Sequence, residues 1–333
     1  MASIFDRSLL ELAKEADAIR KAKWGNDAFY VKNLHINFTN ICSNQCKFCA
    51  FARKKGAEGG YLKDVPSIVQ HVKDKGAAAK ELHIVGGLHP DVDLAYYTDM
   101  ISSLKSEFPD KSIKAFGAVE MDFISRQSGV PLEKLFNIMK GAGLDMMPGG
   151  GAEIFKPEVR NIICPEKVSG ARWLEVMEIA HNAGILTNAT MLYGHYESGE
   201  DREAHLMAIQ SLQERTGGFN AFIPLSFQPA GTKFADVPPV TAVTDLAVTA
   251  ASRIILKDVP HIKAYWVMLG EKTAQIALRF GADDLDGTIE EENIAFAAGG
   301  SSKRGMTEND LKHMISTAGL NPVERDSFYN RVS

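Results

Sequence analysis

Short apolar runs alternate with longer stretches of helical periodicity along most of this chain. Such runs predict strands, and eight of them are present, at 34–39, 81–87, 113–119, 144–149, 185–192, 221–227, 261–267 and 282–287. The stretches between them place apolar residues three or four positions apart, which predicts amphipathic helices. Several stretches reach a glycine where a helix typically ends, as at Gly143 and Gly184.

The alternation of strands with helices predicts an α/β fold, a (β/α)8 barrel of the TIM type, which needs roughly 250 residues. The chain has 333 residues, so the remainder suffices for an N-terminal helix and a C-terminal extension. We expect a single domain, with a helical segment at 1–30, the barrel at 31–290 and the extension at 291–333. An open doubly wound sheet is the alternative, but no G-x-G-x-x-G turn follows the first strand.

Two of the predicted strands carry polar residues on one face. The first alternates apolar residues with His35, Asn37 and Thr39, and the fifth places Asn188 and Thr190 on one side. Alternate residues of a barrel strand face the interior and the helices. These side chains therefore predict an interior cavity for a polar ligand, although a few hydrogen-bonded core residues would give the same pattern.

The first residues of the chain predict a helix that packs on the barrel. Leu9, Leu12, Ala16 and Ile19 fall at helical spacing, and acidic residues interrupt the segment. A targeting segment would have a continuous apolar core or lack acidic residues, so we do not expect one here.

Composition narrows the class of protein. Apolar residues make up 45% of the chain and charged residues 24%, as in an ordinary folded protein. A net charge of -5 offers no basic stripe for nucleic acid, and no apolar run is long enough to span a membrane. Four cysteines, three of them clustered, are not a disulfide framework, so we expect a reducing cytoplasm.

The cysteine cluster is the strongest chemical signal. Cys42, Cys46 and Cys49 have the spacing C-x3-C-x2-C and directly follow the first strand, at the carboxyl-terminal face where barrel enzymes place their active sites. Structural zinc sites and electron-transfer [4Fe–4S] clusters both use four protein ligands. We expect the remaining cysteine, Cys164 in NIICPEK, to be a buried apolar residue. With three cysteines, an iron–sulfur cluster keeps one iron open, and zinc binding remains the alternative.

This loop, with Phe48 before its third cysteine, resembles the radical S-adenosylmethionine (SAM) superfamily. The resemblance implies a [4Fe–4S] cluster on the three cysteines, whose open iron binds the amino and carboxylate groups of SAM. Phe48 would then lie against the adenine, and Gly86 and Gly87 in HIVGGLHP would form the turn that holds the methionine amino group. It also implies cleavage of SAM to a 5′-deoxyadenosyl radical and a reductant such as flavodoxin or ferredoxin. Without the resemblance, Gly86 and Gly87 predict only a tight strand-to-helix turn.

A narrower resemblance covers nearly the whole chain. It is carried by HIVGGLHPD, AFGAVEMD, GLDMMPGGGAEIF, NATMLYGH, GGFNAFIPLSFQPAGT, GADDLDGT and PVERDSFY. Together these segments resemble the aminofutalosine synthase family of menaquinone biosynthesis. Two sister families share the architecture, the cyclic dehypoxanthinyl futalosine synthases and the tyrosine-using enzymes of deazaflavin biosynthesis. PGGGAEIF and GADDLDGT favour the first family, and a non-catalytic metal-binding protein remains a further alternative.

The narrower resemblance implies a transferase reaction. The deoxyadenosyl radical adds to the enolpyruvyl double bond of 3-[(1-carboxyvinyl)oxy]benzoate, and rearrangement and decarboxylation give 6-amino-6-deoxyfutalosine plus methionine. SAM is consumed as a co-substrate in this reaction.

Such a dianionic substrate needs cationic or hydrogen-bond donor groups in the cavity. We expect these at the strand ends, with Arg53, Asn188 and Lys263 binding substrate, and with His89 and His195 in catalytic roles. Glu120 and Glu153 follow the third and fourth strands. We expect Glu153 to bind SAM and Glu120 to act at the catalytic centre or on the ribose.

Overall fold

The computed structural model describes residues 3–289, 294–297 and 305–332. Part of the expected C-terminal extension, at 291–293, 298–304 and 333, therefore lies outside the described residues. Among those that are described, no helix is long and apolar enough to cross a membrane.

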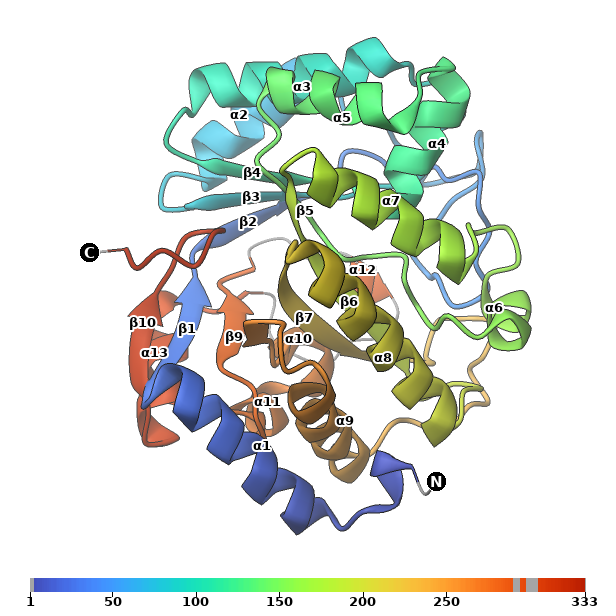
Figure 1. The fold of residues 1–333 in the computed structure, drawn as a ribbon. Coiled ribbons are helices and arrows are strands. Elements are labelled where there is room, and N and C mark those ends of the chain that lie inside the picture. Colours follow the sequence, from blue (N-terminus) through green and yellow to red (C-terminus); the bar gives the residue numbers. More distant parts are fainter. Residues whose placement is uncertain (1–2, 290–293, 298–304, 333) are drawn as a thin grey trace.

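Seven parallel strands form one curled sheet in sequence order (Figure 1). Their bounds are β2 Asn33–Ile36, β3 Glu81–Ile84, β4 Ser112–Ala115, β5 Met146–Met147, β6 Leu186–Tyr193, β7 Phe219–Ser226 and β8 His261–Ile262. Every neighbouring pair in this sheet is parallel, as a (β/α) barrel requires. The predicted α/β barrel fold is therefore confirmed.

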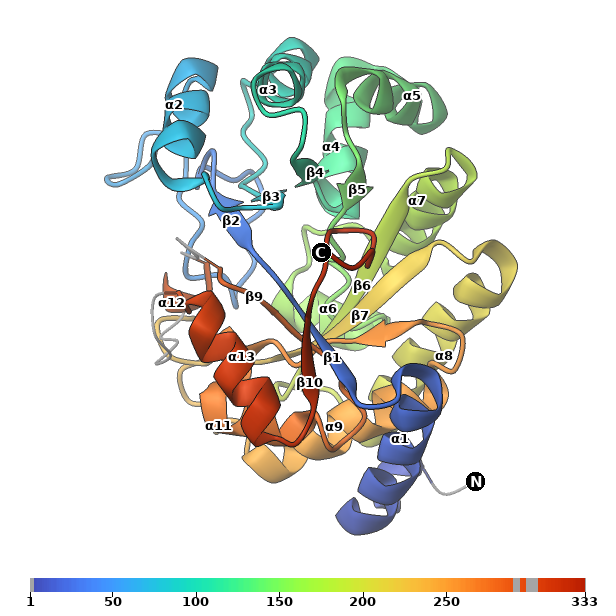
Figure 2. The ribbon, with the colours of Figure 1, turned by 90° about the vertical axis from the view of Figure 1, so that its left-hand side faces the viewer.

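Helices surround the sheet on its outer side (Figure 2). The larger ones are α1 Leu9–Trp24, α2 Val65–Lys75, α3 Leu94–Glu107, α4 Ala118–Ser128, α5 Leu132–Ala142, α7 Gly170–Asn182, α8 Gly199–Thr216, α9 Ala242–Ile255 and α13 Glu308–Thr317. Shorter helical segments are η1 Ile4–Asp6, α6 Pro157–Ile163, α10 Trp266–Leu269, α11 Glu271–Ala277 and α12 Ile294–Ala297.

Local sequence signals explain where several helices begin and end. The Asp64 side chain accepts a hydrogen bond from the Ser67 backbone N–H at the start of α2, and Ser169 caps α7 in the same way. Gly143 and Gly184 take left-handed backbone angles, with φ of 114° and 73°. Both glycines therefore end their helices as the sequence predicts.

A second, three-stranded sheet stands beside the first, in the order β10-β1-β9. Its strands are β1 Asp27–Val31, β9 Asp284–Gly287 and β10 Asn321–Glu324. The predicted eighth strand is present as β9, but it pairs with β1 rather than with the first barrel strand. A single bridge between Lys263 and Asp284 joins it to the end of β8.

The sequence did not reveal β1 and β10. Only Lys32 separates β1 from β2, so the two read as one apolar run. The residues of β10 are half-buried or exposed, and one of its four residues is proline, so the segment has no apolar signature.

The N-terminal helix α1 packs against α9, as its periodicity predicts. Leu12 and Ala16 are buried against Ala250 of α9. Burial of this apolar stripe is what holds the helix on the barrel.

Candidate active site

A cavity of about 350 Å³ lies at the carboxyl-terminal ends of the barrel strands. Its lining comes mainly from the segments that follow β2, β3, β4, β5 and β7, together with side chains of the strands themselves. Cys42, Cys46 and Cys49 all line it. The cysteine loop predicted to be the active-site loop therefore opens onto the interior of the barrel.

Backbone hydrogen bonds fix the cysteine loop from several sides. The Cys42 N–H donates to the Arg53 carbonyl at 3.0 Å, and the Ser43 N–H donates to the Leu88 carbonyl at 2.8 Å. Farther along, the Lys47 N–H donates to the Ile163 carbonyl at 2.9 Å. The loop backbone is thus held while its three thiols remain free.

The donor set fits a three-thiolate cluster. Within the described residues, no three Cys, His, Asp or Glu side chains are grouped to hold one metal ion. In a cubane each thiolate binds a different iron, so convergence on one point is not required. Burial raises the pKa of Cys46 to about 12, so a metal must displace the thiol proton there.

Cys164 is close to this loop in space although it is distant in sequence. It ends α6, next to Ile163, whose carbonyl accepts from Lys47 of the loop. Its side chain is buried in the apolar core and does not line the cavity. The prediction that Cys164 is a buried apolar residue is confirmed.

Crowding explains the glycines at the end of β3. A Cβ on Gly87 would lie 2.2 Å from the Ile41 carbonyl oxygen, and one on Gly86 would lie 2.6 Å from the Phe38 ring. Neither position tolerates a side chain unless the cysteine loop or Phe38 moves. Gly86 and Gly87 therefore let the β3 turn pack against the segment that carries the cysteines, and both also line the cavity.

Glu120 is a half-buried carboxyl group that lines the cavity. It accepts hydrogen bonds from the backbone N–H of Gly117 at 2.7 Å and of Gly86 at 3.2 Å. Burial raises its pKa to about 7 despite these two donors. At neutral pH this group can therefore both accept and release a proton.

Glu153 and Lys167 form an ion pair in the wall of the cavity. The Lys167 ammonium also lies 5.0 Å from the centre of the Phe48 ring, within range of a cation–π contact. Its pKa is raised above the usual value because Glu153, Cys46 and Cys164 outweigh the effect of burial. The sequence analysis identified Phe48 and Glu153 but missed Lys167, which no local motif marks.

The deeper part of the cavity is lined by His35, His83, Thr190 and Asp286. His35 and Thr190 belong to the polar strand faces noted in the sequence. His83 was missed, although the same alternation along β3 would have placed it beside Glu81 on the inner face. These side chains give the barrel a polar floor.

Five predicted site residues are absent from the cavity lining that the structure describes, namely Arg53, His89, His195, Asn188 and Lys263. The exposed Arg53 guanidinium donates to carbonyls of its own loop, and the buried Asn188 lies within β6. His89 Nδ1 accepts from the Asp91 N–H, and His195 Nε2 donates to the Leu192 carbonyl. Lys263 is paired with Asp286 at 3.1 Å, behind the floor. Their roles in binding or catalysis remain predictions.

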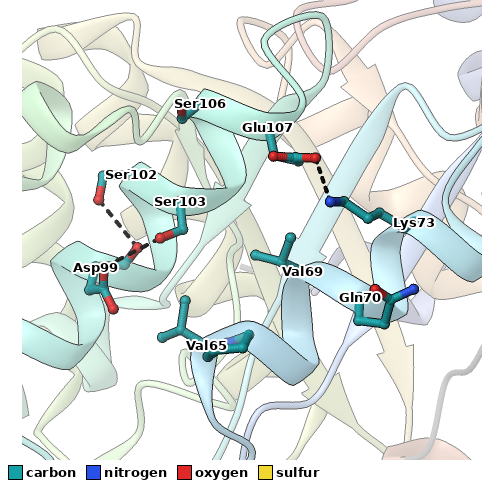
Figure 3. A pocket seen from close by; sticks show the side chains of 10 residues that line it. Val65, Val69, Gln70, Lys73, Asp99, Ser102, Ser103, Ser106 and Glu107 are labelled. Atoms are coloured by element: carbon teal, nitrogen blue, oxygen red, sulfur yellow. Dashed lines mark hydrogen bonds and ion pairs between the residues drawn. The ribbon is translucent and has the colours of Figure 1, made fainter.

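A second hollow lies between α2 and α3 (Figure 3). Its sides include the Lys73–Glu107 ion pair at 2.6 Å and the Asp99 carboxylate, which accepts from Ser103. It shares no residue with the cysteine-lined cavity and lies among the outer helices. We therefore assign the chemistry to the cavity inside the barrel.

Comparison with known proteins agrees with this site. A model of the radical SAM superfamily matches residues 36–209, and one of the CofH/MqnC C-terminal region matches residues 216–333. An aminodeoxyfutalosine synthase of Thermus thermophilus is 42% identical over 98% of this chain and 89% of that protein. A 5-amino-6-(D-ribitylamino)uracil–L-tyrosine 4-hydroxyphenyl transferase of Methanothermobacter thermautotrophicus is 40% identical over 98% of this chain and 90% of that protein.

Solved structures support the fold. The chain is similar to a methylornithine synthase, with a TM-score of 0.77 at 17% identity, covering 96% of this chain and 91% of that one. It is also similar to the FeFe-hydrogenase maturase HydG of Carboxydothermus hydrogenoformans, with a TM-score of 0.76 at 16% identity over 98% and 75% of the two chains. Radical SAM domains use a [4Fe–4S] cluster and SAM, which accounts for the three free thiols at the cavity. The chain belongs to the radical SAM superfamily, to the group whose C-terminal region is of the CofH/MqnC type.

Proposed function

We propose that this protein is an aminodeoxyfutalosine synthase. The observation that carries this proposal is the 42% identity to a protein of that name, over nearly the full length of both chains. The cavity fits an aromatic acid, because apolar side chains of β6, of β7 and of the residue after β7 form one wall and polar groups form the floor. The apolar residues are Leu192, Ile223, Leu225 and Phe227.

The proposed reaction joins two small molecules. The adenosyl group of SAM is transferred to the methylene carbon of 3-[(1-carboxyvinyl)oxy]benzoate, and methionine is released. The aryl group then moves from the ether oxygen to the neighbouring carbon, and the enolpyruvyl carboxylate leaves as carbon dioxide. One electron enters when SAM is cleaved and one leaves with carbon dioxide, so the balance closes on 6-amino-6-deoxyfutalosine with its ring carboxylate intact.

Each lining residue has a distinct task in this proposal. Cys42, Cys46 and Cys49 hold the [4Fe–4S] cluster, which supplies the electron for SAM cleavage. Phe48, kept in place by Lys167, packs against the adenine. These groups lie at the mouth of the barrel, where the loops after the strands meet.

Four further residues complete the SAM site in this proposal. Gly86 and Gly87 leave room for the methionine part of the molecule, and Glu153 binds a polar group of SAM. Glu120 is placed to bind a ribose hydroxyl or to exchange a proton. Arg53, Asn188, Lys263, His89 and His195 would then act on the substrate only through neighbours that line the cavity.

A second candidate function has direct support. The tyrosine 4-hydroxyphenyl transferase of Methanothermobacter is 40% identical over 98% of this chain, nearly as similar as the synthase. A tyrosine-using enzyme must hold an ammonium group, and Asp286 is an acidic residue in the cavity lining. However, Asp286 is already paired with Lys263 at 3.1 Å, which leaves it less able to bind a second cation.

Anaerobic assays separate the two functions. The reconstituted enzyme is mixed with SAM and dithionite or reduced flavodoxin, and with either the enolpyruvyl benzoate or tyrosine plus 5-amino-6-(D-ribitylamino)uracil. We expect 6-amino-6-deoxyfutalosine by mass spectrometry from the first mixture and no adduct from the second. A tyrosine-derived product without the deoxyadenosyl adduct would reassign the protein to the transferase.

The metal content tests the non-catalytic alternative. We expect a brown protein with about four irons per chain after anaerobic reconstitution. A colourless protein with one zinc and no SAM cleavage would contradict any radical function. Because the four cysteines are free and the proposed cluster needs reducing conditions, we place the protein in a reducing cytoplasm with a flavodoxin or ferredoxin as electron donor.

A further inference from the structure

Two histidines meet face to face in the floor of the cavity. His35 of β2 and His83 of β3 are partners in the parallel register of these strands. Their rings are stacked, with centroids 4.5 Å apart and planes 14° from parallel. Both rings line the cavity, so any occupant of the deep end touches them.

His83 has an acidic neighbour on its own strand, the buried side chain of Glu81. Glu81 Oε1 is 3.9 Å from His83 Nδ1, longer than an ordinary hydrogen bond, and its charge partly offsets the lowering of the His83 pKa by burial. His35 is only 7% exposed, so little water reaches it from outside. A ligand that enters the cavity would meet two stacked imidazole rings and could accept a hydrogen bond from each.

The charges behind the histidines are already balanced. Glu81 accepts from Lys114 at 2.6 Å and from the Ser327 hydroxyl at 2.7 Å. On the other side, Lys263 pairs with Asp286 at 3.1 Å, and Arg325 pairs with Asp284 at 2.6 Å. Neither histidine is therefore needed to neutralise this network.

Both rings are neutral at pH 7. Burial lowers the pKa of His35 to about 3, with His83 and Lys114 acting in the same direction, and burial also lowers the pKa of His83. A neutral imidazole still offers one N–H donor. Two such donors side by side match the two oxygens of a carboxylate, without a fixed positive charge.

The substrate has two carboxylates, and the position of the histidines in the cavity decides which of them they can bind. His35 and His83 belong to the strands themselves, whereas the cysteines and Gly86 belong to the loops that follow those strands. The SAM end of the cavity is therefore at its mouth and the histidines are at its floor. The methylene carbon must face the mouth to receive the adenosyl group, which turns the ring carboxylate toward the floor.

We propose that His35 and His83 form the subsite for the ring carboxylate of the aromatic substrate. This inference rests on the proposed function for the identity of the acid. It goes further by naming two binding residues that no motif in the sequence marks. The paired N–H groups hold the benzoate and thereby align the enolpyruvyl group with the adenosyl carbon.

The test is equilibrium binding to the reconstituted, unreduced holoenzyme with SAM present. The ligands are 3-[(1-carboxyvinyl)oxy]benzoate and its ring carboxamide. The carboxamide is neutral and has one acceptor oxygen in place of the two oxygens of the ring carboxylate. The variants are His35→Gln and His83→Gln. The matched control is His181→Gln, because His181 also has a low pKa, about 4, caused by burial, and does not line the cavity.

We expect each cavity variant to weaken binding of the acid by about tenfold or more, as loss of a hydrogen bond to a charged group implies. Binding of the carboxamide should change little, and His181→Gln should bind both ligands like the wild type. Circular dichroism and iron content report whether each variant is folded and loaded. A variant that does not fold is replaced by His35→Asn or His83→Asn.

The outcomes separate this inference from the proposed function. Suppose that the wild type converts the acid. If the cavity variants then bind the acid normally, or if they lose affinity for the acid and the carboxamide equally, the subsite is wrong and the proposed function stands. If binding of the acid depends on the histidines but reduction yields no adduct, the subsite stands and the reaction is wrong. If wild type neither binds nor converts the acid, both are wrong.

Discussion

Burial drives the ionisable side chains of the cavity toward their neutral forms. It raises the pKa of Cys46 to about 12 and of Glu120 to about 7, and it lowers the pKa of His35 to about 3. Two exceptions are Lys167, whose pKa the Glu153 carboxylate raises, and Asp286, whose pKa Lys263 lowers against the effect of burial. The charges that remain in the cavity wall are therefore paired, Lys167 with Glu153 and Asp286 with Lys263.

At the residue scale, Cys164 lies near the cysteine loop, so we test whether it is a ligand of the proposed cluster. We expect Cys164→Ala to retain about four irons per chain, because its side chain is buried in the core and does not line the cavity. Cys46→Ala should lose the cluster, because it removes a lining thiol. Iron analysis and the visible absorption of anaerobically reconstituted protein measure both. Loss of iron in the Cys164→Ala variant would make it a ligand and contradict the open iron.

The raised pKa of Glu120 predicts a pH dependence of stability. Its pKa is about 7 in the folded protein and 4.5 in the reference state, so the folded state holds the proton more tightly. The resulting stabilisation is complete below about pH 4.5 and is lost as the pH rises through about 7, with a total of roughly 3 kcal/mol.

Thermal unfolding of the wild type and of Glu120→Gln across the pH range measures this effect as the difference between their stabilities. We expect the stability of the wild type relative to the variant to fall between about pH 5 and pH 8, because glutamine does not titrate. A constant difference across this range would show that the two backbone donors, Gly86 and Gly117, keep Glu120 ionised throughout.

At the scale of elements, the turn after β3 and the cysteine loop are joined by hydrogen bonds and close packing. Ser43 of the loop donates to the Leu88 carbonyl through its N–H at 2.8 Å and its hydroxyl at 3.0 Å. Gly87 sits where a Cβ would meet the Ile41 carbonyl. The glycine turn thus positions the cysteine loop as well as lining the cavity.

This close contact predicts the effect of a methyl group. We expect Gly87→Ala to destabilise the protein by about 1–3 kcal/mol and to lower the amount of cluster bound, because the Ile41 backbone must move. Gly141→Ala is the matched control, since a Cβ there meets nothing within 4 Å. Thermal unfolding and iron content measure both variants. Full iron loading in Gly87→Ala would show that the loop adapts without the glycine.

At the scale of the whole molecule, the C-terminal segment makes buried contacts with strands from both sheets. β10 pairs with β1 in parallel register, and β1 lies between β10 and β9 in the sheet (Figure 1). Arg325 is fully buried and pairs with Asp284 of β9, and Ser327 donates to Glu81 of β3. The end of the chain therefore supports the floor on which His83 and Asp286 lie.

Removing the buried charge of this segment should destabilise the whole molecule. We expect Arg325→Leu to reduce the free energy of unfolding by about 3–5 kcal/mol, because Asp284 is left buried without its partner. Arg331→Leu should change it by less than about 1 kcal/mol, because Arg331 is 65% exposed in its pair with Asp27. Urea denaturation compares them, and equal effects would contradict a supporting role for the buried network.

Several features of this protein follow from the sequence alone. Strand and helix periodicity predicted all eight strands of the expected barrel, because burial of apolar faces leaves a local pattern that survives in the sequence. The spacing of Cys42, Cys46 and Cys49 predicted that they share one loop at the cavity, because residues of one short loop are neighbours in sequence as well as in space. The same locality explains the correct placement of Gly86, Gly87, Phe48, Glu120 and Glu153 at the cavity.

Only the tertiary structure decided the rest. It paired β9 with β1, placed Lys167 over Phe48 and brought His35 beside His83, because these contacts join segments that are far apart in the sequence. It also placed His89, His195 and Arg53 outside the cavity lining, since position after a strand does not determine where a side chain points. The cysteine loop at the mouth of the barrel is therefore local in the sequence, whereas the polar floor of the cavity forms only when the chain folds.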